Sequence, residues 1–131
     1  GPGRTRPASR RPDGTGHALI QRRAQSSGAP EAMTVALAFT ERATEDVIDA
    51  FEWYETQRIG LGDQFLDSLE RTLDLARLMP EVGPDVHRGL RRLLIRTFPY
   101  AIYYRVADNR IEVRGCLHQR RARRAWRRRA E

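Results

Sequence analysis

Arginine pairs and a single histidine dominate the residues of this sequence that could do chemistry. Arg91 and Arg92 stand side by side, and His118 is followed closely by Arg120 and Arg121. The guanidinium group is a permanently charged fork that binds phosphate or carboxylate, but it cannot accept a proton near neutral pH. The imidazole group can accept a proton near neutral pH, so His118 is the one member of this set suited to acid or base catalysis. We favour the alternative that its ring caps a sheet edge or holds a partner's carboxylate.

Other basic and aromatic residues of the second half could contact a target without doing chemistry. The full set of candidate contact residues is Arg91, Arg92, Arg96, Tyr103, Arg105, His118, Arg120, Arg121 and Trp126. Tyrosines in strands more often pack than react, and a tryptophan side chain transfers no proton. We interpret His87 as a solvated loop residue, and Trp53 and Tyr54 as core or helix–sheet contacts.

Charge is distributed unevenly along the chain. Residues 33–80 carry four Arg and ten acidic residues, whereas residues 81–131 carry fourteen Arg and five acidic residues. This polarity indicates a negatively charged partner, either nucleic acid or an acidic protein surface, that docks on the second half. Residues 119–131 alone contain seven Arg, which would repel one another without an acidic partner.

Cysteine content and hydropathy limit the class of protein. Cys116 is the only cysteine, which excludes an internal disulfide and a cysteine-rich metal site. The sequence contains neither a run of about 20 apolar residues nor a recognisable signal peptide. We therefore expect a cytoplasmic protein that uses no metal or other cofactor and has no membrane partner.

One domain is predicted after an N-terminal extension. Residues 1–32 are rich in Gly, Pro, Ser and Arg and show no sustained apolar period, as in a disordered basic tail or an added or upstream extension. Residues 33–131 leave about 100 positions, enough for a single small core. The sequence leaves open whether the domain forms a homodimer or a hetero-oligomer with a partner.

The first half of the domain predicts a strand and two helices. Alternating apolar residues at 35–39 indicate the strand, and Thr40 is a plausible N-cap for the first helix. Apolar residues then recur at helical spacing as far as Tyr54. The glycines of segment 58–62 break this helix, and a second apolar stripe must end before Pro80. An antiparallel helical hairpin results.

The second half predicts strands at 90–97, 100–106 and 111–118, with a hairpin turn at 107–110. One face should carry Ile102, Tyr104, Val106, Ile111, Val113, Gly115 and Leu117, and the other face Tyr103, Arg105, Glu112 and Arg114. The predicted class is α+β. An N-terminal strand and an antiparallel helical hairpin precede a three-stranded antiparallel run, which completes an antiparallel sheet packed on the helices.

Several short motifs occur in an order that resembles a known superfamily. They are Trp53-Tyr54, Gly60-Leu61-Gly62 with Phe65, Pro80, Gly89-Leu90-Arg91-Arg92, Phe98-Pro99-Tyr100 with Ile102-Tyr103-Tyr104, and His118-Gln119-Arg120-Arg121 before Trp126. Together they cover almost all of residues 33–129. In this order and spacing they resemble the RelE/ParE superfamily of toxins from bacterial type II toxin–antitoxin systems. The resemblance implies a plasmid-stabilisation type of toxin that arrests growth and is held inactive by the C-terminal segment of a cognate antitoxin.

The superfamily contains two activities, and the resemblance is closer to the ParE type. ParE-like members poison DNA gyrase by binding it and are not nucleases, whereas RelE-like members cleave messenger RNA in the ribosome. RelE-like nucleases carry a Tyr or His after the last strand, but here that stretch offers only Arg and Trp126. We therefore expect a non-enzymatic gyrase inhibitor. The alternatives are a metal-independent endoribonuclease using His118, Arg92, Arg120 and Arg121, and a simple nucleic-acid-binding module.

Overall fold

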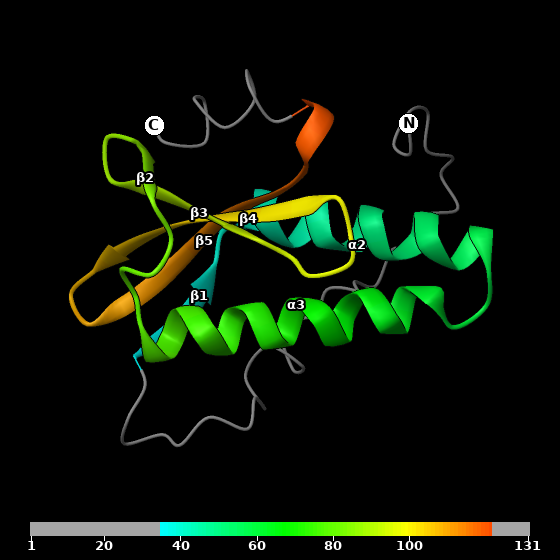
Figure 1. Ribbon diagram of the computed structural model, residues 1–131, viewed down its shortest axis with the longest axis horizontal. Helices are drawn as coiled ribbons and strands as arrows, with labels where there is room; N and C mark the ends of the chain where they lie inside the picture. The colour runs from blue at the N-terminus through cyan, green and yellow to red at the C-terminus, as the bar shows by residue number, and fades with distance from the viewer. Residues whose placement is uncertain (1–34, 122–131) are drawn as a thin grey trace.

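The computed structural model describes residues 35–121, so the predictions for residues 1–32 and for Trp126 lie outside the described residues. Its elements in chain order are β1 (Ala36–Phe39), α2 (Glu41–Gln57), α3 (Leu61–Leu78), β2 (Asp85–His87), β3 (Leu90–Leu94), β4 (Tyr100–Ala107), β5 (Arg110–His118) and the short 3-10 helix η2 (Gln119–Arg121). Both long helices lie against one face of the sheet, which gives two layers (Figure 1). The predicted α+β class is confirmed.

Local chemistry accounts for the ends of the two helices. Thr40 is the N-cap of α2, and its hydroxyl accepts the Ala43 N–H at 3.1 Å. Gly60 has a φ of +92°, a left-handed conformation that glycine adopts without steric cost, and α3 begins at the next residue. The Glu55 carboxylate accepts the N–H groups of Gly60 at 3.1 Å and Gly62 at 2.9 Å. The turn between the helices is therefore fixed by a side chain that the sequence analysis did not single out.

The sheet has five strands in the order β1-β5-β4-β3-β2, and it is mixed. Strands β3, β4 and β5 form the predicted antiparallel run. Strand β1, however, pairs with β5 in parallel, so the prediction of an entirely antiparallel sheet was wrong in this respect. The parallel pairing arises because the two helices carry the chain along the sheet before it enters the antiparallel strands. The first and last strands of the domain thus pair with each other, with β1 at one edge of the sheet.

Strand β2 is the element that the sequence analysis missed. The segment around His87, predicted to be a solvated loop, forms a short hairpin with β3 and leaves the His87 side chain half-buried. Arg88 and Gly89 both have positive φ, at 49° and 86°, as a two-residue type I′ turn requires. The same geometry occurs in the β4–β5 turn, where Asp108 and Asn109 have φ of 46° and 61° and confirm the predicted hairpin.

A bulge in β5 changes which residues face the helices. Tyr103 pairs with Gly115, but the next residue, Tyr104, pairs with Val113, so β5 contains one extra residue at this point. Beyond the bulge, Cys116 joins the helix-side core, whereas Leu117 packs on the opposite face with Tyr103. The prediction that Gly115 and Leu117 share the face of Ile111 and Val113 was therefore wrong, because the alternation rule assumes an unbroken strand.

The core contains most of the aromatic residues that carried the family resemblance. The Tyr54 ring lies 5.4 Å from the Phe65 ring, 5.0 Å from the Phe98 ring and 6.1 Å from the Tyr100 ring, measured between centroids. The contacts with Phe98 and Tyr100 are edge-to-face, a geometry that adds to the free energy gained from burial. Trp53 touches Tyr54 edge-on at 5.1 Å but remains 38% exposed, so it covers this aromatic cluster without being buried in it.

Candidate target-binding face

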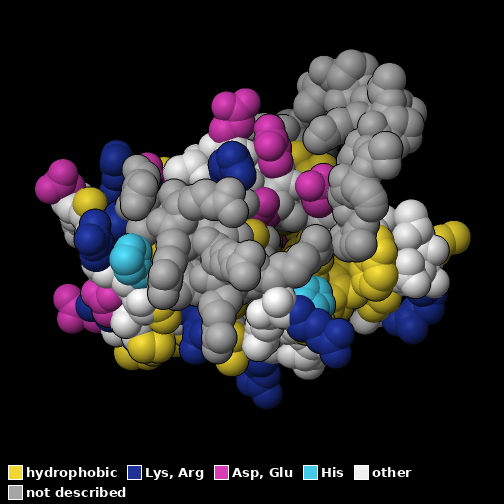
Figure 2. Space-filling view, turned by 90° about the horizontal axis from the view of Figure 1, so that it is seen from above, with side chains coloured by type: hydrophobic (Ala, Val, Ile, Leu, Met, Phe, Trp, Pro, Cys, Tyr) yellow, Lys and Arg dark blue, Asp and Glu magenta, His cyan; other side chains and the backbone are white. Residues whose placement is uncertain are grey.

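The face of the sheet opposite the helices, called here the outer face, carries the predicted aromatic and basic residues. Its described members on the three central strands include Leu90, Arg92, Ala101, Tyr103, Arg105, Glu112, Gly115 and Leu117. Figure 2 looks onto the molecule from this side, where Arg side chains lie around the rim of the part that the structure describes. The residues proposed from the sequence divide into several groups by their surroundings.

Arg92 is an exposed cation of the outer face. It pairs across the ladder with Tyr103, and its guanidinium both hydrogen-bonds the Tyr103 hydroxyl and lies close enough to act on it electrostatically. Burial raises the pKa of Tyr103 above its ordinary value of 10.0, while Arg92 opposes this rise through its charge and the hydrogen bond. The phenol therefore stays neutral near neutral pH and positions the guanidinium instead of exchanging protons.

Arg91 has a different environment although it is the next residue in the chain. Its Nη1 donates to the backbone carbonyls of Gly83 at 2.6 Å and Glu81 at 3.1 Å. Tyr104 holds the same loop, since its hydroxyl donates to the Pro80 carbonyl at 2.8 Å and accepts the Gly83 N–H at 3.1 Å. Arg91 is thus bound to the loop between α3 and β2, and this arrangement favours a structural role over contact with a target.

Arg105 and its neighbours extend the outer face toward the β2–β3 turn. Arg105 Nη1 donates to the Arg88 carbonyl at 2.5 Å, which ties β4 to that turn. Glu112 follows on the neighbouring strand and forms an ion pair with Arg114 at 2.6 Å. The Glu112 carboxylate on the outer face is therefore already paired with an arginine of the same strand. Arg88, at the turn itself, is exposed.

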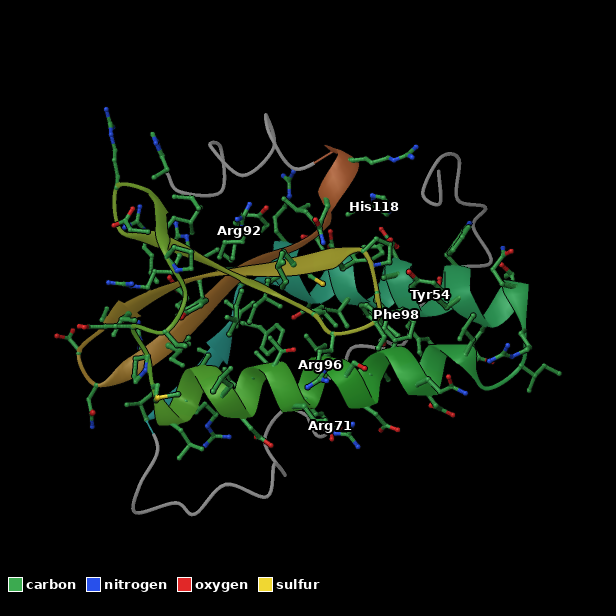
Figure 3. The ribbon with its side chains drawn as sticks, viewed as in Figure 1. Tyr54, Arg71, Arg92, Arg96, Phe98 and His118 are labelled. Atoms are coloured by element: carbon green, nitrogen blue, oxygen red, sulfur yellow. The ribbon has the colours of Figure 1, made fainter. Side chains whose placement is uncertain are left out.

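His118 lies apart from Arg92 (Figure 3). It pairs with Tyr100 at the end of β5, and their ring centroids are 5.2 Å apart, so it joins the edge of the aromatic cluster. Its Nδ1 accepts the Arg120 N–H at 3.1 Å, an arrangement in which the ring proton is carried by Nε2. Arg92 faces the other side of the sheet, and three residue pairs along the strands, roughly 10 Å, separate the two positions.

The remaining predicted contacts lie elsewhere. Arg96 is exposed in the loop between β3 and β4, beside α3, and so does not belong to the outer face. Arg120 and Arg121 form η2 directly after β5, where the Arg120 side chain is exposed. Within residues 35–121 no three His, Cys, Asp or Glu side chains are grouped so that they could hold a metal ion.

The sequence of this domain matches a known protein family. The model of the family described as ParE toxin of type II toxin-antitoxin system, parDE, matches residues 37–123. The chain belongs to the ParE toxin family. The match spans both helices and all of β2 to β5, and the predicted relationship to the RelE/ParE superfamily is confirmed.

A solved structure gives independent support for the ParE fold. A chain from the structure described as the chromosomal ParDE TA system from P. aeruginosa superposes with a TM-score of 0.58 and 16% sequence identity. The similarity covers 66% of this chain and 97% of that chain, and at this identity it supports the fold alone. No curated protein matches the sequence. In the part of the chain that the structure describes, no helix is long and apolar enough to cross a membrane.

Proposed function

We propose that this ParE-family toxin stops growth by binding DNA gyrase directly through the outer face, and that a cognate antitoxin neutralises it. The observation that supports binding over cleavage is the separation of the exposed cation Arg92 from His118. RNA cleavage without a metal needs a proton acceptor and a proton donor at the same phosphate as the cations. Among residues 35–121, the titratable group paired with Arg92 across the strands is Tyr103, a buried phenol with a raised pKa, whereas a protein surface can be bound by cations and apolar groups alone.

A ribosome-dependent mRNA endonuclease is the second candidate, and one observation favours it. The Arg120 N–H donates to Nδ1 of His118, which holds the imidazole, the one group of this set suited to proton transfer, next to the two arginines of η2. On that alternative, Arg120 and Arg121 would hold the phosphate next to His118. This arrangement would place the active site at the end of β5, away from Arg92.

Expression of the full chain from a tightly controlled promoter separates these functions. A gyrase inhibitor should produce DNA breaks and filamentous cells with intact transcripts, and Arg92→Glu should reduce both effects. An endonuclease should produce cleaved transcripts with intact DNA, and His118→Ala should abolish the cleavage. Arg58→Glu is the matched control, because Arg58 is an exposed arginine in the turn between α2 and α3. Absence of toxicity would favour a simple nucleic-acid-binding module, with affinity that falls steeply as salt rises.

Neutralisation by an antitoxin has a separate test. Co-expression with the cognate antitoxin should restore growth and yield a stable complex that can be purified. Growth arrest that persists at equal expression levels would count against neutralisation by direct binding.

A further inference from the structure

The outer face contains one carboxylate among several arginines. Strands β3, β4 and β5 together contain five Arg and a single acidic residue, Glu112. Arg114 Nη1 donates to Glu112 Oε1 at 2.6 Å, and the side chains of Arg114 and Glu112 are 21% and 30% exposed. A short contact that is partly screened from water is typical of a strong charge-assisted hydrogen bond. Glu112 therefore already occupies part of the capacity of this face to bind carboxylates.

The bulge in β5 lies at the same place. Gly115 pairs with Tyr103 and Val113 pairs with Tyr104, so Arg114 is the extra residue of the bulge. Glu112 and Arg114 are two residues apart, and their side chains share the outer face as strand alternation requires. Bulges interrupt a ladder locally and occur often beside functional sites. The arginine bound by Glu112 thus stands where the regular pairing of the two strands is interrupted.

Arg105 gives Glu112 a second cationic neighbour. The two residues stand directly opposite each other in the β4–β5 ladder, where side chains of opposite charge attract. Arg105 Nη1 also donates to the Arg88 carbonyl at 2.5 Å, which keeps this side chain on the outer face. Glu112 thus lies between an arginine of its own strand and an arginine of the neighbouring strand, as a carboxylate from a bound protein would.

A purely structural role accounts poorly for the bond between Glu112 and Arg114. Both residues belong to β5, so the bond joins no two elements of the fold. Ion pairs that remain accessible to water contribute little to stability, because solvent and salt screen them. The backbone ladder already holds β4 and β5 together along eight residue pairs. An effect of Glu112 on binding is therefore easier to explain than an effect on folding.

We propose that Glu112 is an internal competitor of the target, and that a carboxylate from an acidic surface of the target replaces it on Arg114 when the outer face is bound. In the free toxin Glu112 compensates the charges of Arg114 and Arg105. It also lowers the affinity of the face for acidic proteins, because a bound carboxylate must displace it. Naming gyrase as the occupant rests on the proposed function, whereas the competition for Arg114 is a property of the toxin alone.

Removal of the competing charge tests this directly. Glu112→Gln in the full chain removes the charge and keeps the shape of the side chain. Hexaglutamate is the acidic probe, titrated at low salt and followed by NMR at the backbone amides of residues 112 and 115. The variant should bind it roughly threefold to fivefold more tightly than the wild type, and the gain should shrink as salt rises. Glu45→Gln removes an exposed carboxylate of α2, changes the net charge equally, and should leave the affinity unchanged.

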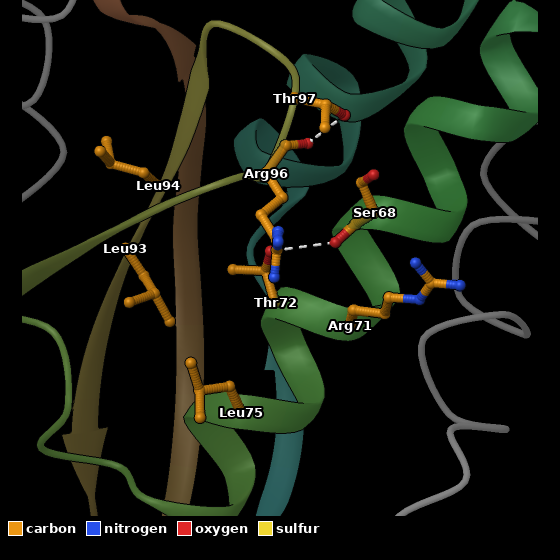
Figure 4. A pocket seen from close by; sticks show the side chains of 8 residues that line it. All are labelled: Ser68, Arg71, Thr72, Leu75, Leu93, Leu94, Arg96 and Thr97. Carbon is orange, nitrogen blue, oxygen red and sulfur yellow. Dashed lines mark hydrogen bonds between the residues drawn. The ribbon is translucent and has the colours of Figure 1, made fainter.

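Removal of the arginine should have the opposite effect. Arg114→Gln should weaken the binding of hexaglutamate roughly threefold to fivefold, since a charge-assisted contact is lost. Arg96→Gln is the matched control, because Arg96 is an exposed arginine that lies beside Thr72 of α3 and outside the outer face (Figure 4). The same variants are then compared by surface plasmon resonance on immobilised gyrase, where Glu112→Gln should again bind more tightly.

The outcomes separate the two claims. A gain in hexaglutamate binding by Glu112→Gln, with no binding of gyrase by any variant, would refute the proposed function and support the competition. Equal or weaker binding of hexaglutamate by the folded variant would overturn the inference, whatever the result with gyrase. A gain for a short DNA duplex without a gain for hexaglutamate would also overturn it, in favour of phosphate as the competing group. If Glu112→Gln does not fold, Glu112→Thr replaces it with the same expected gain.

Discussion

Adjacent arginines of β3 have different roles at the scale of single residues. Arg91 satisfies two carbonyls of the loop after α3, whereas Arg92 faces solvent beside Tyr103. The strand alternation sends their side chains to opposite faces, so a charge pair that looks like one site in the sequence is two sites in the fold. Substitutions at Arg91 should therefore affect stability, and substitutions at Arg92 should affect binding.

Replacing Tyr104 with Phe should destabilise the domain. The change removes the acceptor of the buried Gly83 N–H and the donor to the Pro80 carbonyl, and an unpaired buried group costs about 1–3 kcal/mol. Urea unfolding followed by circular dichroism measures the loss. Tyr54→Phe is the matched control, because no hydrogen bond of the Tyr54 hydroxyl is formed with the residues described. Equal effects of the two substitutions would contradict the assigned role of Tyr104.

Stability should also fall in alkaline solution. Burial raises the pKa of Tyr104 above 10.0, although the Gly83 N–H and the Arg91 charge oppose the rise, and burial has the same effect on Tyr103. A folded-state pKa above the unfolded value means that the contribution is fully present below about pH 10 and is lost as pH rises through the folded pKa. Thermal unfolding across this range should show the decline, and Tyr104→Phe should make it smaller. A flat profile would contradict the prediction.

At the scale of elements, Glu55 links α2 to the first turn of α3. Its carboxylate accepts the N–H groups of Gly60 and Gly62, as an N-terminal capping group does, and removing such a group costs about 1–2 kcal/mol. Glu55→Ala should lower the free energy of unfolding by that amount in urea titrations. Glu45→Ala, which removes an exposed carboxylate of α2, should cause a change within about 0.5 kcal/mol.

The sequence predicts the long elements well and the short or irregular ones poorly. Apolar periodicity over many residues indicates both helices, and Thr40 marks the start of α2 correctly. Strand β2 contains only three residues, too few for a periodic signal, although Gly89 is a turn-forming residue that could have suggested the hairpin. The bulge in β5 and the parallel pairing of β1 depend on contacts between distant segments, which local patterns do not encode.

The candidate site was predicted in composition but not in arrangement. The sequence indicates which strands carry the arginines, and the structure places Arg92 and Arg105 on the outer face. The sequence could not indicate that Arg96 lies beside α3, because the position of Arg96 depends on how the β3–β4 loop packs against that helix.

At the scale of the whole molecule, the two layers differ in charge. Acidic residues outnumber Arg by ten to four in residues 33–80, which include both helices, and the balance reverses in residues 81–131. This polarity should steer an acidic surface toward the sheet and away from the helices. Charge reversal at Arg92 should therefore slow association with the target by roughly tenfold at low salt, whereas Arg58→Glu should change it little.

Surface plasmon resonance with immobilised gyrase measures this effect across a salt series. The difference between Arg92→Glu and the wild type should shrink as salt screens the interaction. Equal association rates for Arg92→Glu and the wild type at low salt would show that the outer face does not contact the target.

Gyrase inhibition is the central claim, and a supercoiling assay with purified components tests it most directly. The full chain, titrated into gyrase with relaxed plasmid and ATP, should block supercoiling and leave cleaved DNA, and an equimolar amount of antitoxin added first should prevent both effects. Normal supercoiling in a large excess of folded toxin would contradict the account.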